Sequence, residues 1–295
     1  MTLNLRQRLM ARQETGELIV APGVYDMISL RLADRLGFEA LYMTGYGTVA
    51  SHLGLPDAGL ATYSDMVGRV ERMAQMARTP LVADADTGYG GLLNVEYTVR
   101  GYERAGAAAI QIEDQEFPKR CGHTPNRRVI NAEDMVLKVK VAVESRSNRD
   151  FLVIARTDAR TSLGLDEALR RAELYAQAGA DILFIESPET ELELERIAAA
   201  FRGSRWLVVN MAEGGRTPIL KACDLSQLGF AMVIYPATGF LAAAAALERA
   251  YKDLLQHGLS GPAADRLLSF EAMHSLMGFD EVWQRDRTLN TSVNR

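Results

Sequence analysis

Short apolar runs recur through this chain at regular intervals, and no other feature limits its possible folds as strongly. Eight of these runs are continuous rather than alternating, which is typical of strands buried on both faces. They are residues 18–21, 40–43, 81–83, 109–112, 151–155, 182–185, 206–209 and 231–235. Segments with helical periodicity, such as 165–178 and 191–201, lie between them. Eight strand–helix units in series predict a (β/α)8 barrel of the TIM type.

The length of the chain fits one large α/β domain. Its 295 residues are 48% hydrophobic, which is sufficient for a full core. We therefore expect a single barrel domain over residues 1–295. Residues 262–295 exceed what eight units require, yet Phe270, Phe279 and Trp283 make this segment partly apolar. We expect it to form a C-terminal helical extension that packs on another surface, such as a partner subunit.

Charge and cysteine content exclude several classes of protein. The net charge is −5, from 33 basic and 38 acidic residues, and no long basic run predicts binding to nucleic acid. Two cysteines form no disulfide framework, which favours a cytoplasmic location. The polar N-terminus does not resemble a signal peptide. The longest apolar stretch, 230–247, is interrupted by Pro236 and Gly239, so we expect no membrane partner.

Acidic residues follow the predicted strands at the end where barrel enzymes keep their sites. Asp84 and Asp86 are two positions apart at a strand end, so their side chains point to the same side. Two carboxylates so placed repel each other unless a cation neutralises them, and Mg²⁺ suits such ligands, with Mn²⁺ as a possible substitute. The alternative is a pair of turn or capping residues. Asp57 and Glu113 strengthen the metal interpretation.

The segment Lys119-Arg120-Cys121-Gly122-His123 is the second candidate site. Its charged neighbours favour the thiolate form of Cys121 and hence a catalytic role. The alternative, a buried structural thiol, suits Cys223 better. A zinc site is disfavoured because no second Cys/His pair has ligand spacing. His123 either orients a carboxylate, donates to an oxyanion, or is a surface histidine.

Further polar residues follow other predicted strands. Arg156 comes directly after a buried strand, so we expect it to face an anionic ligand or a carboxylate partner. Glu186 and Asn210 stand at equivalent strand ends, where a structural role at the rim is an alternative to function. The glycine-rich turns 45–47 and 88–91 could offer N–H groups to an anion, but they fit neither a P-loop nor a dinucleotide fingerprint.

Seven ordered motifs resemble the isocitrate lyase/phosphoenolpyruvate mutase superfamily over essentially the whole chain. Two examples are Asp84-Ala85-Asp86-Thr87-Gly88-Tyr89-Gly90 and Lys119-Arg120-Cys121-Gly122-His123. The other motifs are residues 43–47, 53–57, 113–115, 155–160 and 210–215. The resemblance implies an α/β barrel whose final helix is exchanged between subunits of a homotetramer, a dimer of dimers.

The resemblance also implies roles for single residues. It places Mg²⁺ at Asp86 and, directly or through water, at Asp84, Asp57 and Glu113. It makes residues 119–123 a mobile gating loop. The expected substrate contacts are Tyr42, Thr44, Gly45, Tyr46, Gly122, Arg156, Glu186 and Asn210.

These implications predict a Mg²⁺-dependent carbon–carbon lyase. It would cleave a substituted malate, or another 2-hydroxy or 2-oxo dicarboxylate, into a 2-oxo acid such as pyruvate and a carboxylic acid. Cys121 would be the general acid, and Lys119, His123, Arg156 and Glu113 would complete the catalytic set. Tyr42, Asp57 and Glu113, the last with a metal-bound water, are alternative bases.

The substrate prediction rests on two departures from the family pattern. Where 2-methylisocitrate lyases place an arginine after the eighth strand, this chain has Leu241, and a second arginine is replaced within 269–271. A third carboxylate would then be buried unpaired, which disfavours tricarboxylates. The alternatives are 2-methylisocitrate lyase, oxaloacetate hydrolase and carboxyphosphonoenolpyruvate phosphonomutase activity, because the last group shares the cysteine motif.

Overall fold

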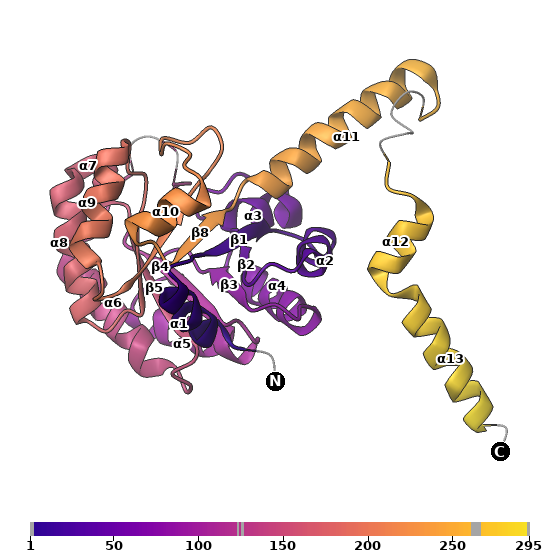
Figure 1. The fold of residues 1–295 in the computed structure, drawn as a ribbon, viewed down its shortest axis with the longest axis horizontal. Coiled ribbons are helices and arrows are strands. Elements are labelled where there is room, and N and C mark those ends of the chain that lie inside the picture. The colour runs from indigo at the N-terminus through magenta and orange to yellow at the C-terminus, as the bar shows by residue number, and fades with distance from the viewer. Residues whose placement is uncertain (1–2, 123, 125–126, 261–266, 294–295) are drawn as a thin grey trace. The chain divides into compact units, whose positions relative to one another are not determined.

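A computed structural model describes residues 3–122, 124, 127–260 and 267–293. Eight parallel strands form a closed barrel in which each strand pairs with its neighbours in sequence, and β8 returns to β1 (Figure 1). The predicted (β/α)8 fold is confirmed. The strands are β1 (Ile19–Val24), β2 (Leu41–Met43), β3 (Leu81–Asp84), β4 (Ala109–Glu113), β5 (Leu152–Thr157), β6 (Ile182–Ile185), β7 (Trp206–Asn210) and β8 (Met232–Tyr235).

Several strands continue past the predicted apolar runs into polar residues. Asp84 ends β3, Glu113 ends β4, and Glu113 is in register with Arg156 of β5. These polar positions stay extended because parallel pairing around the closed barrel continues to its C-terminal end. The barrel itself therefore fixes the backbone beneath these side chains.

Helices surround the strands in the barrel unit (Figure 1). They begin and end with ordinary capping chemistry: the Asp26 carboxylate accepts the N–H of Ser29 at the start of α2, and Gly37 follows its end at φ +85°. The helices are α1 (Leu5–Thr15), α2 (Met27–Leu36), α3 (Gly45–Leu53), α4 (Tyr63–Met76), α5 (Leu92–Arg104), α6 (Ala132–Ser145), α7 (Ala159–Leu163), α8 (Leu165–Gln177), α9 (Glu191–Phe201) and α10 (Ala222–Leu228). The chain continues after β8 into α11 (Thr238–His257).

The core has two layers. One lies between the strands and the surrounding helices, and the other fills the barrel interior with side chains such as Ile154 and Phe184. Leu5 and Leu9 of α1 belong to the inner layer and are fully buried. The sequence did not predict α1, because only these two positions in a polar segment carry its apolar contact.

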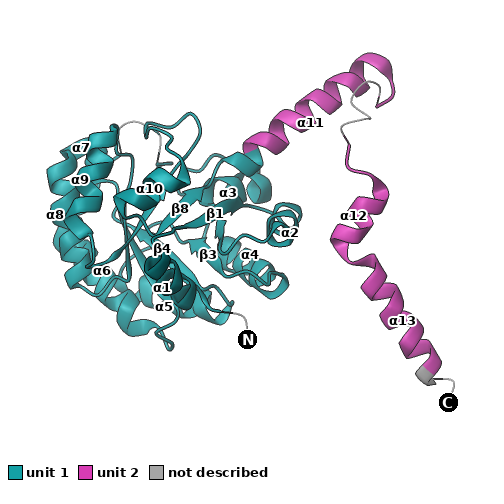
Figure 2. Ribbon diagram, in the orientation of Figure 1, with its two compact units in different colours: residues 1–240 teal, residues 241–295 magenta. Residues whose placement is uncertain are grey.

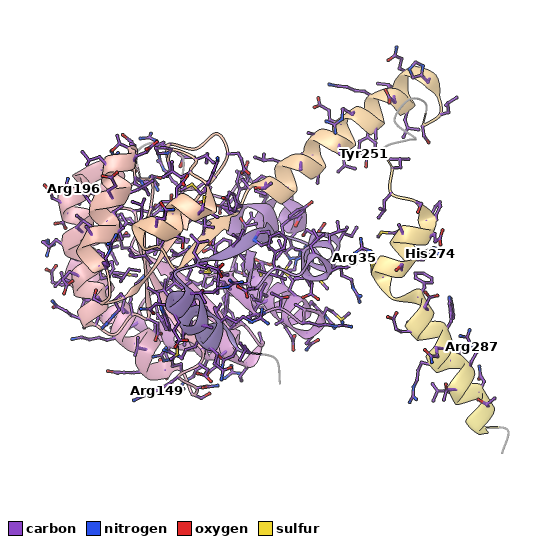
Figure 3. The ribbon with its side chains drawn as sticks, viewed as in Figure 1. Arg35, Arg149, Arg196, Tyr251, His274 and Arg287 are labelled. Carbon is purple, nitrogen blue, oxygen red and sulfur yellow. The ribbon has the colours of Figure 1, made fainter. Side chains whose placement is uncertain are left out.

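The chain divides into two compact units, residues 1–240 and 241–295 (Figure 2). The sequence placed its C-terminal extension at 262–295, whereas the second unit already begins at Leu241. It contains most of α11, together with α12 (Phe270–Met277) and α13 (Phe279–Val293). Tyr251 projects from α11 and His274 from α12 (Figure 3). Among the described residues, no helix is long and apolar enough to cross a membrane.

Candidate active site

A cavity lies in the barrel unit, lined by side chains from strand ends and the loops that follow them. Its volume is about 70 Å³. Each water-sized group needs roughly 10–15 Å³ of such space, so this volume favours a small ligand over one as large as a nucleotide. The lining residues are Tyr42, Thr44, Tyr46, Asp57, Asp84, Glu113, Lys119, Arg120, Cys121, Gly122, Arg156, Glu186, Asn210, Ala212, Ile234, Pro236, Ala237 and Phe240.

An acidic corner holds three carboxylates around one ammonium group. Lys119 Nζ contacts a carboxylate oxygen of Asp57 and lies 2.7 Å from Asp86 Oδ1. The backbone N–H of Asp86 donates to Asp84 Oδ1 at 3.1 Å. Asp86 adopts a left-handed backbone conformation, with φ +49°, which turns it toward Asp84. The charge of Lys119 is therefore directed at these carboxylates.

Burial makes the negative charge of this corner costly. It raises the pKa of Asp84, and it raises the pKa of Asp86 to about 6 despite the nearby ammonium of Lys119. Burial also opposes the charge of Lys119, but Asp86 and Asp57 outweigh it and raise the pKa of Lys119 well above normal. One lysine thus leaves the carboxylates with uncompensated negative charge at neutral pH.

The acidic corner fits a divalent cation in the manner of Mg²⁺. Asp84 and Asp86 supply the oxygen ligands that Mg²⁺ prefers, and it commonly uses only one or two carboxylates with water and substrate oxygens. Among the described residues, no three Asp, Glu, His or Cys side chains already form a closed metal cage. Lys119 contacts both Asp57 and Asp86 and supplies part of the positive charge at this corner.

Arg156 forms a second charged group at the ends of β4, β5 and β6. It binds Asp158 through two hydrogen bonds, Nε to Oδ2 at 2.9 Å and Nη2 to Oδ1 at 2.8 Å. Glu113 Oε2 lies 3.4 Å from Nε, and Glu186 Oε2 lies 3.3 Å from Nη1. Burial raises the pKa of Glu113 well above its usual value. Asn210 Nδ2 donates to Glu186 Oε2 at 3.2 Å.

Tyr42 is tied to the acidic corner through Gln111. Its hydroxyl donates to Gln111 Oε1 at 2.9 Å, and Gln111 Nε2 lies 3.3 Å from Asp84 Oδ1. Burial, with the charge of Asp84, raises the pKa of Tyr42 well above 10. A phenol that is hard to ionise and already donates its proton is a poor base, which argues against Tyr42 in that role.

The segment with Cys121 covers the cavity from one side. Cys121 and Gly122 line it, and a Cβ placed on Gly122 would lie 2.5 Å from Arg156 Nη2. Only glycine allows the backbone to approach the guanidinium so closely. The carbonyl of Gly122 lies 3.1 Å from Ser187 Oγ. His123, predicted as catalytic, lies outside the described residues.

Part of the cavity lining, which we call the apolar wall, consists of hydrophobic side chains. The rings of Tyr46 and Phe240 meet edge to face, with centroids 5.1 Å apart. Ala212, Ile234 and Pro236 complete this wall. Its side chains offer contact to methyl or short alkyl groups rather than a charge to a further carboxylate.

The structure gathers most of the sequence-predicted residues in one place. Gly45 and Asp86 are the exceptions among those described, since neither lines the cavity: Gly45 lies against the Asp84 carboxylate, and Asp86 lies beneath Lys119. Three further residues at the site, Gln111, Asp158 and Phe240, were not predicted from the sequence. A glutamine inside an otherwise apolar strand was the one available signal for Gln111.

Comparison with known proteins agrees with this geometry. A family model described as phosphoenolpyruvate phosphomutase matches residues 9–255. The chain belongs to this family. A solved structure of 2,3-dimethylmalate lyase, described as a PEP mutase/isocitrate lyase superfamily member, has a TM-score of 0.88 at 35% identity and covers 96% of this chain and 95% of its own. The superfamily predicted from the motifs is confirmed.

Curated relatives within the phosphoenolpyruvate phosphomutase family include lyases. 2,3-Dimethylmalate lyase from Eubacterium barkeri is 45% identical over 280 residues, 95% of this chain and 96% of the relative. 2-Methylisocitrate lyase from Aeropyrum pernix is 41% identical over 273 residues, which cover 92% of this chain and 87% of the relative. These relatives support the prediction of a carbon–carbon lyase.

One solved structure of this family was obtained with a metal. Phosphonopyruvate hydrolase in complex with oxalate and Mg²⁺ has a TM-score of 0.85 at 30% identity, covering 96% of this chain and 98% of that one. Oxalate and Mg²⁺ are ligands of that protein.

Proposed function

We propose that this protein is a Mg²⁺-dependent lyase that cleaves a 3-alkyl-substituted malate into a 2-oxo acid and a carboxylic acid. One observation carries the proposal: a single small cavity joins an acidic corner, the Arg156 guanidinium, Cys121 and an apolar wall. Similarity to 2,3-dimethylmalate lyase, 45% identical, supports the same substrate class.

Mg²⁺ would be held by Asp84 and Asp86, with Asp57 and Glu113 reached directly or through water. Its role would be to bind the oxygens of the 2-oxo acid half and to stabilise negative charge there. Mn²⁺, which shares these oxygen ligands, is the expected substitute. The uncompensated charge of the acidic corner and the Mg²⁺ complex of the related phosphonopyruvate hydrolase support this assignment.

The residues of the chain account for the proton transfers. Asp57 would take the proton of the 2-hydroxyl, since Tyr42 already donates to Gln111 and burial raises the pKa of Glu113 well above its usual value. The bond between C2 and C3 breaks, and its electron pair stays on the departing half as an enediolate. Arg156, with Asn210 and His123, would offer donors to that charge. Cys121 then gives its thiol proton to C3, so protons and electrons balance without a redox partner.

The remaining predicted residues would hold the carboxylates, contact the substrate or exclude water. Lys119 keeps Asp57 and Asp86 in place through its ammonium group. Thr44, Tyr46 and Gly122 line the cavity as substrate contacts. Because residues 119–122 line the cavity, they would keep water from the enediolate before Cys121 protonates it.

The apolar wall makes a specific prediction about substrate choice. A methyl group on C3 would contact Phe240 and Tyr46, whereas a third carboxylate would meet no cation there. Burying that carboxylate unpaired costs several kcal/mol, so tricarboxylates should be cleaved at least about 100-fold less efficiently. Leu241, at the position where 2-methylisocitrate lyases are expected to have an arginine, also disfavours a tricarboxylate substrate.

The test is an assay that measures 2-oxo acid release over a panel of malates, citramalate, 2,3-dimethylmalate, oxaloacetate, isocitrate and 2-methylisocitrate, with Mg²⁺ and with Mn²⁺. The expected result is the highest kcat/KM for 2,3-dimethylmalate, which yields pyruvate and propionate. Equal or better cleavage of 2-methylisocitrate would contradict the reasoning from the apolar wall.

A phosphonomutase reaction is the alternative that the family model itself raises. Phosphorus NMR of the protein with carboxyphosphonoenolpyruvate distinguishes it, since rearrangement moves the phosphorus signal. An unchanged spectrum together with dimethylmalate cleavage supports the lyase.

We also propose that the protein is a cytoplasmic homotetramer, a dimer of dimers with its final helix exchanged between subunits. Large apolar side chains on the second unit support this assembly because they are exposed in a single chain. Leu255 is 90% exposed, Phe270 84% and Trp283 52%. Light scattering of the full chain tests the proposal, and a monomer at micromolar concentration would contradict it.

A further inference from the structure

Arg127 is a buried cation on the same loop as Cys121. We call the described residues of this loop, 116–122, 124 and 127–130, the cysteine loop. The guanidinium of Arg127 is fully buried, and it contacts a carboxylate oxygen of Asp158, which is equally buried. Burying an unpaired guanidinium is costly, so this position requires the Asp158 charge.

Asp158 is shared between two guanidinium groups. The oxygen that Arg127 contacts, Oδ1, also accepts from Arg156 Nη2 at 2.8 Å, and Oδ2 accepts from Arg156 Nε at 2.9 Å. Burial opposes ionisation of Asp158, but the charges of Arg156 and Arg127 outweigh it and lower its pKa. The orientation of Arg156, a residue that lines the cavity, therefore depends on a carboxylate that the cysteine loop helps to hold.

The other nitrogen of the Arg127 guanidinium is linked, through Ser187, to Gly122 of the cysteine loop. Arg127 Nη2 contacts the hydroxyl of Thr161 and lies 3.2 Å from Ser187 Oγ. Ser187 Oγ is 3.1 Å from the carbonyl of Gly122. Ser187 has φ +59°, a left-handed conformation that is uncommon for serine. Its hydroxyl joins Arg127 to the residue that follows Cys121.

We propose that Arg127 is a positioning residue that couples the placement of Cys121 at the cavity to the orientation of Arg156. Through Asp158 it holds the guanidinium that faces the substrate, and through Ser187 it holds the backbone beside the proton donor. The reaction side of this inference rests on the proposed lyase function. The structural side, the link between the cysteine loop and Asp158, does not.

Arg127→Met removes both links, and Arg127→Lys keeps the charge beside Asp158 but cannot also bridge to Thr161 and Ser187. Ser187→Ala removes the hydroxyl that joins Arg127 to Gly122 and that also lies 3.1 Å from Glu186 Oε1, but it leaves the contact between Arg127 and Asp158. The matched control is Arg128→Met, because the neighbouring Arg128 side chain is 78% exposed and forms an ion pair with Glu116, which is itself partly exposed. Hydrogen exchange of a peptide spanning the cysteine loop is measured for each protein, with and without oxalate and Mg²⁺.

Wild type and Arg128→Met are expected to show the same slow exchange in the cysteine loop. Arg127→Met should exchange at least about 10-fold faster, with Arg127→Lys and Ser187→Ala between them. Arg127→Met should lower kcat about 100-fold while the affinity for Mg²⁺ with oxalate and KM change little, because misplacement by about 1 Å is enough for such a loss.

Wild-type exchange in both Arg127→Lys and Ser187→Ala would overturn the proposal, even if Arg127→Met fails to fold. A folded Arg127→Met protein with wild-type exchange and kcat would also overturn it. If the wild type cleaves no dicarboxylate, the lyase proposal fails, yet the exchange measurements still decide whether Arg127 holds the cysteine loop.

Discussion

Replacing Gly45 by alanine tests whether the acidic corner is a metal site. Gly45 begins α3, and a Cβ built there would lie 2.5 Å from Asp84 Oδ2 and 3.2 Å from its Cγ. Ordinary carbon–oxygen contacts are about 3.3 Å, so the carboxylate must move by about 0.8 Å. It cannot rotate freely, because Oδ1 accepts from the Asp86 N–H at 3.1 Å and lies 3.3 Å from Gln111 Nε2.

The expected consequence is weaker metal binding in a folded protein. Mg²⁺ requires near-ideal ligand geometry, and disturbing the support of a ligand typically lowers metal affinity 10- to 100-fold. Calorimetric titration with Mg²⁺ measures this change, and the metal concentration needed for half-maximal activity should rise in parallel. Circular dichroism checks the fold.

Gly68→Ala is the matched control. Gly68 lies within α4, and a Cβ there would meet nothing within 4 Å. Alanine in a helix interior is favoured over glycine by up to about 1 kcal/mol, so this variant should be at least as stable as wild type and bind Mg²⁺ normally. Wild-type Mg²⁺ affinity in Gly45→Ala would refute the assignment of Asp84 as a metal ligand.

Three further predictions concern the proton donor, the acidic corner and the apolar wall. Cys121→Ala should lower kcat by orders of magnitude while Mg²⁺ binding survives, and wild-type turnover in this variant would exclude Cys121 as the acid. Cys223→Ala should leave kcat unchanged, because Cys223 is exposed and not the buried structural thiol expected from the sequence. Mg²⁺ affinity should rise with pH, up to tenfold per unit below about 6, because burial raises the pKa of Asp86 from 3.8 to about 6. In the metal-free protein the same pKa shift stabilises the folded state at low pH; this stabilisation is complete below about pH 4 and is lost as the pH rises through about 6. Calorimetry between pH 4 and 8 measures both the stability and the Mg²⁺ affinity, and an Mg²⁺ affinity that does not change with pH would contradict the shift. Phe240→Ala should lower kcat/KM for 2,3-dimethylmalate about 10-fold and leave malate unchanged, whereas an equal loss for both substrates would place Phe240 outside the alkyl contact.

Several features of this protein follow from local sequence. The strands were predictable because a run of apolar residues buried on both faces has few alternatives, and helix ends such as Gly37 carry their own signal. The acidic corner was predictable because Asp84 and Asp86 sit two positions apart at a strand end. α1 was missed because most of its residues are polar and only Leu5 and Leu9 make buried contacts.

Side-chain direction at the strand ends was decided by the tertiary structure. Glu113 and Asp114 are adjacent in sequence, yet only Glu113 lines the cavity. The Asp114 carboxylate instead accepts hydrogen bonds from the hydroxyl groups of Thr157, at 2.7 Å, and Tyr175, at 2.8 Å. Neighbouring positions on a strand point to opposite faces, and only the closed barrel determines which face is the inside.

The sequence by itself determined the barrel and the inventory of reactive groups, because hydrophobic rhythm and residue type are local properties. The tertiary structure alone decided the partners of those groups. Lys119, which seemed in sequence to flank the thiol, instead binds Asp57 and Asp86. Arg127 and Asp158 are 31 residues apart and form one buried pair. Charge pairing acts over a few ångströms in space, and the fold, not the distance along the chain, sets which charges come within that range.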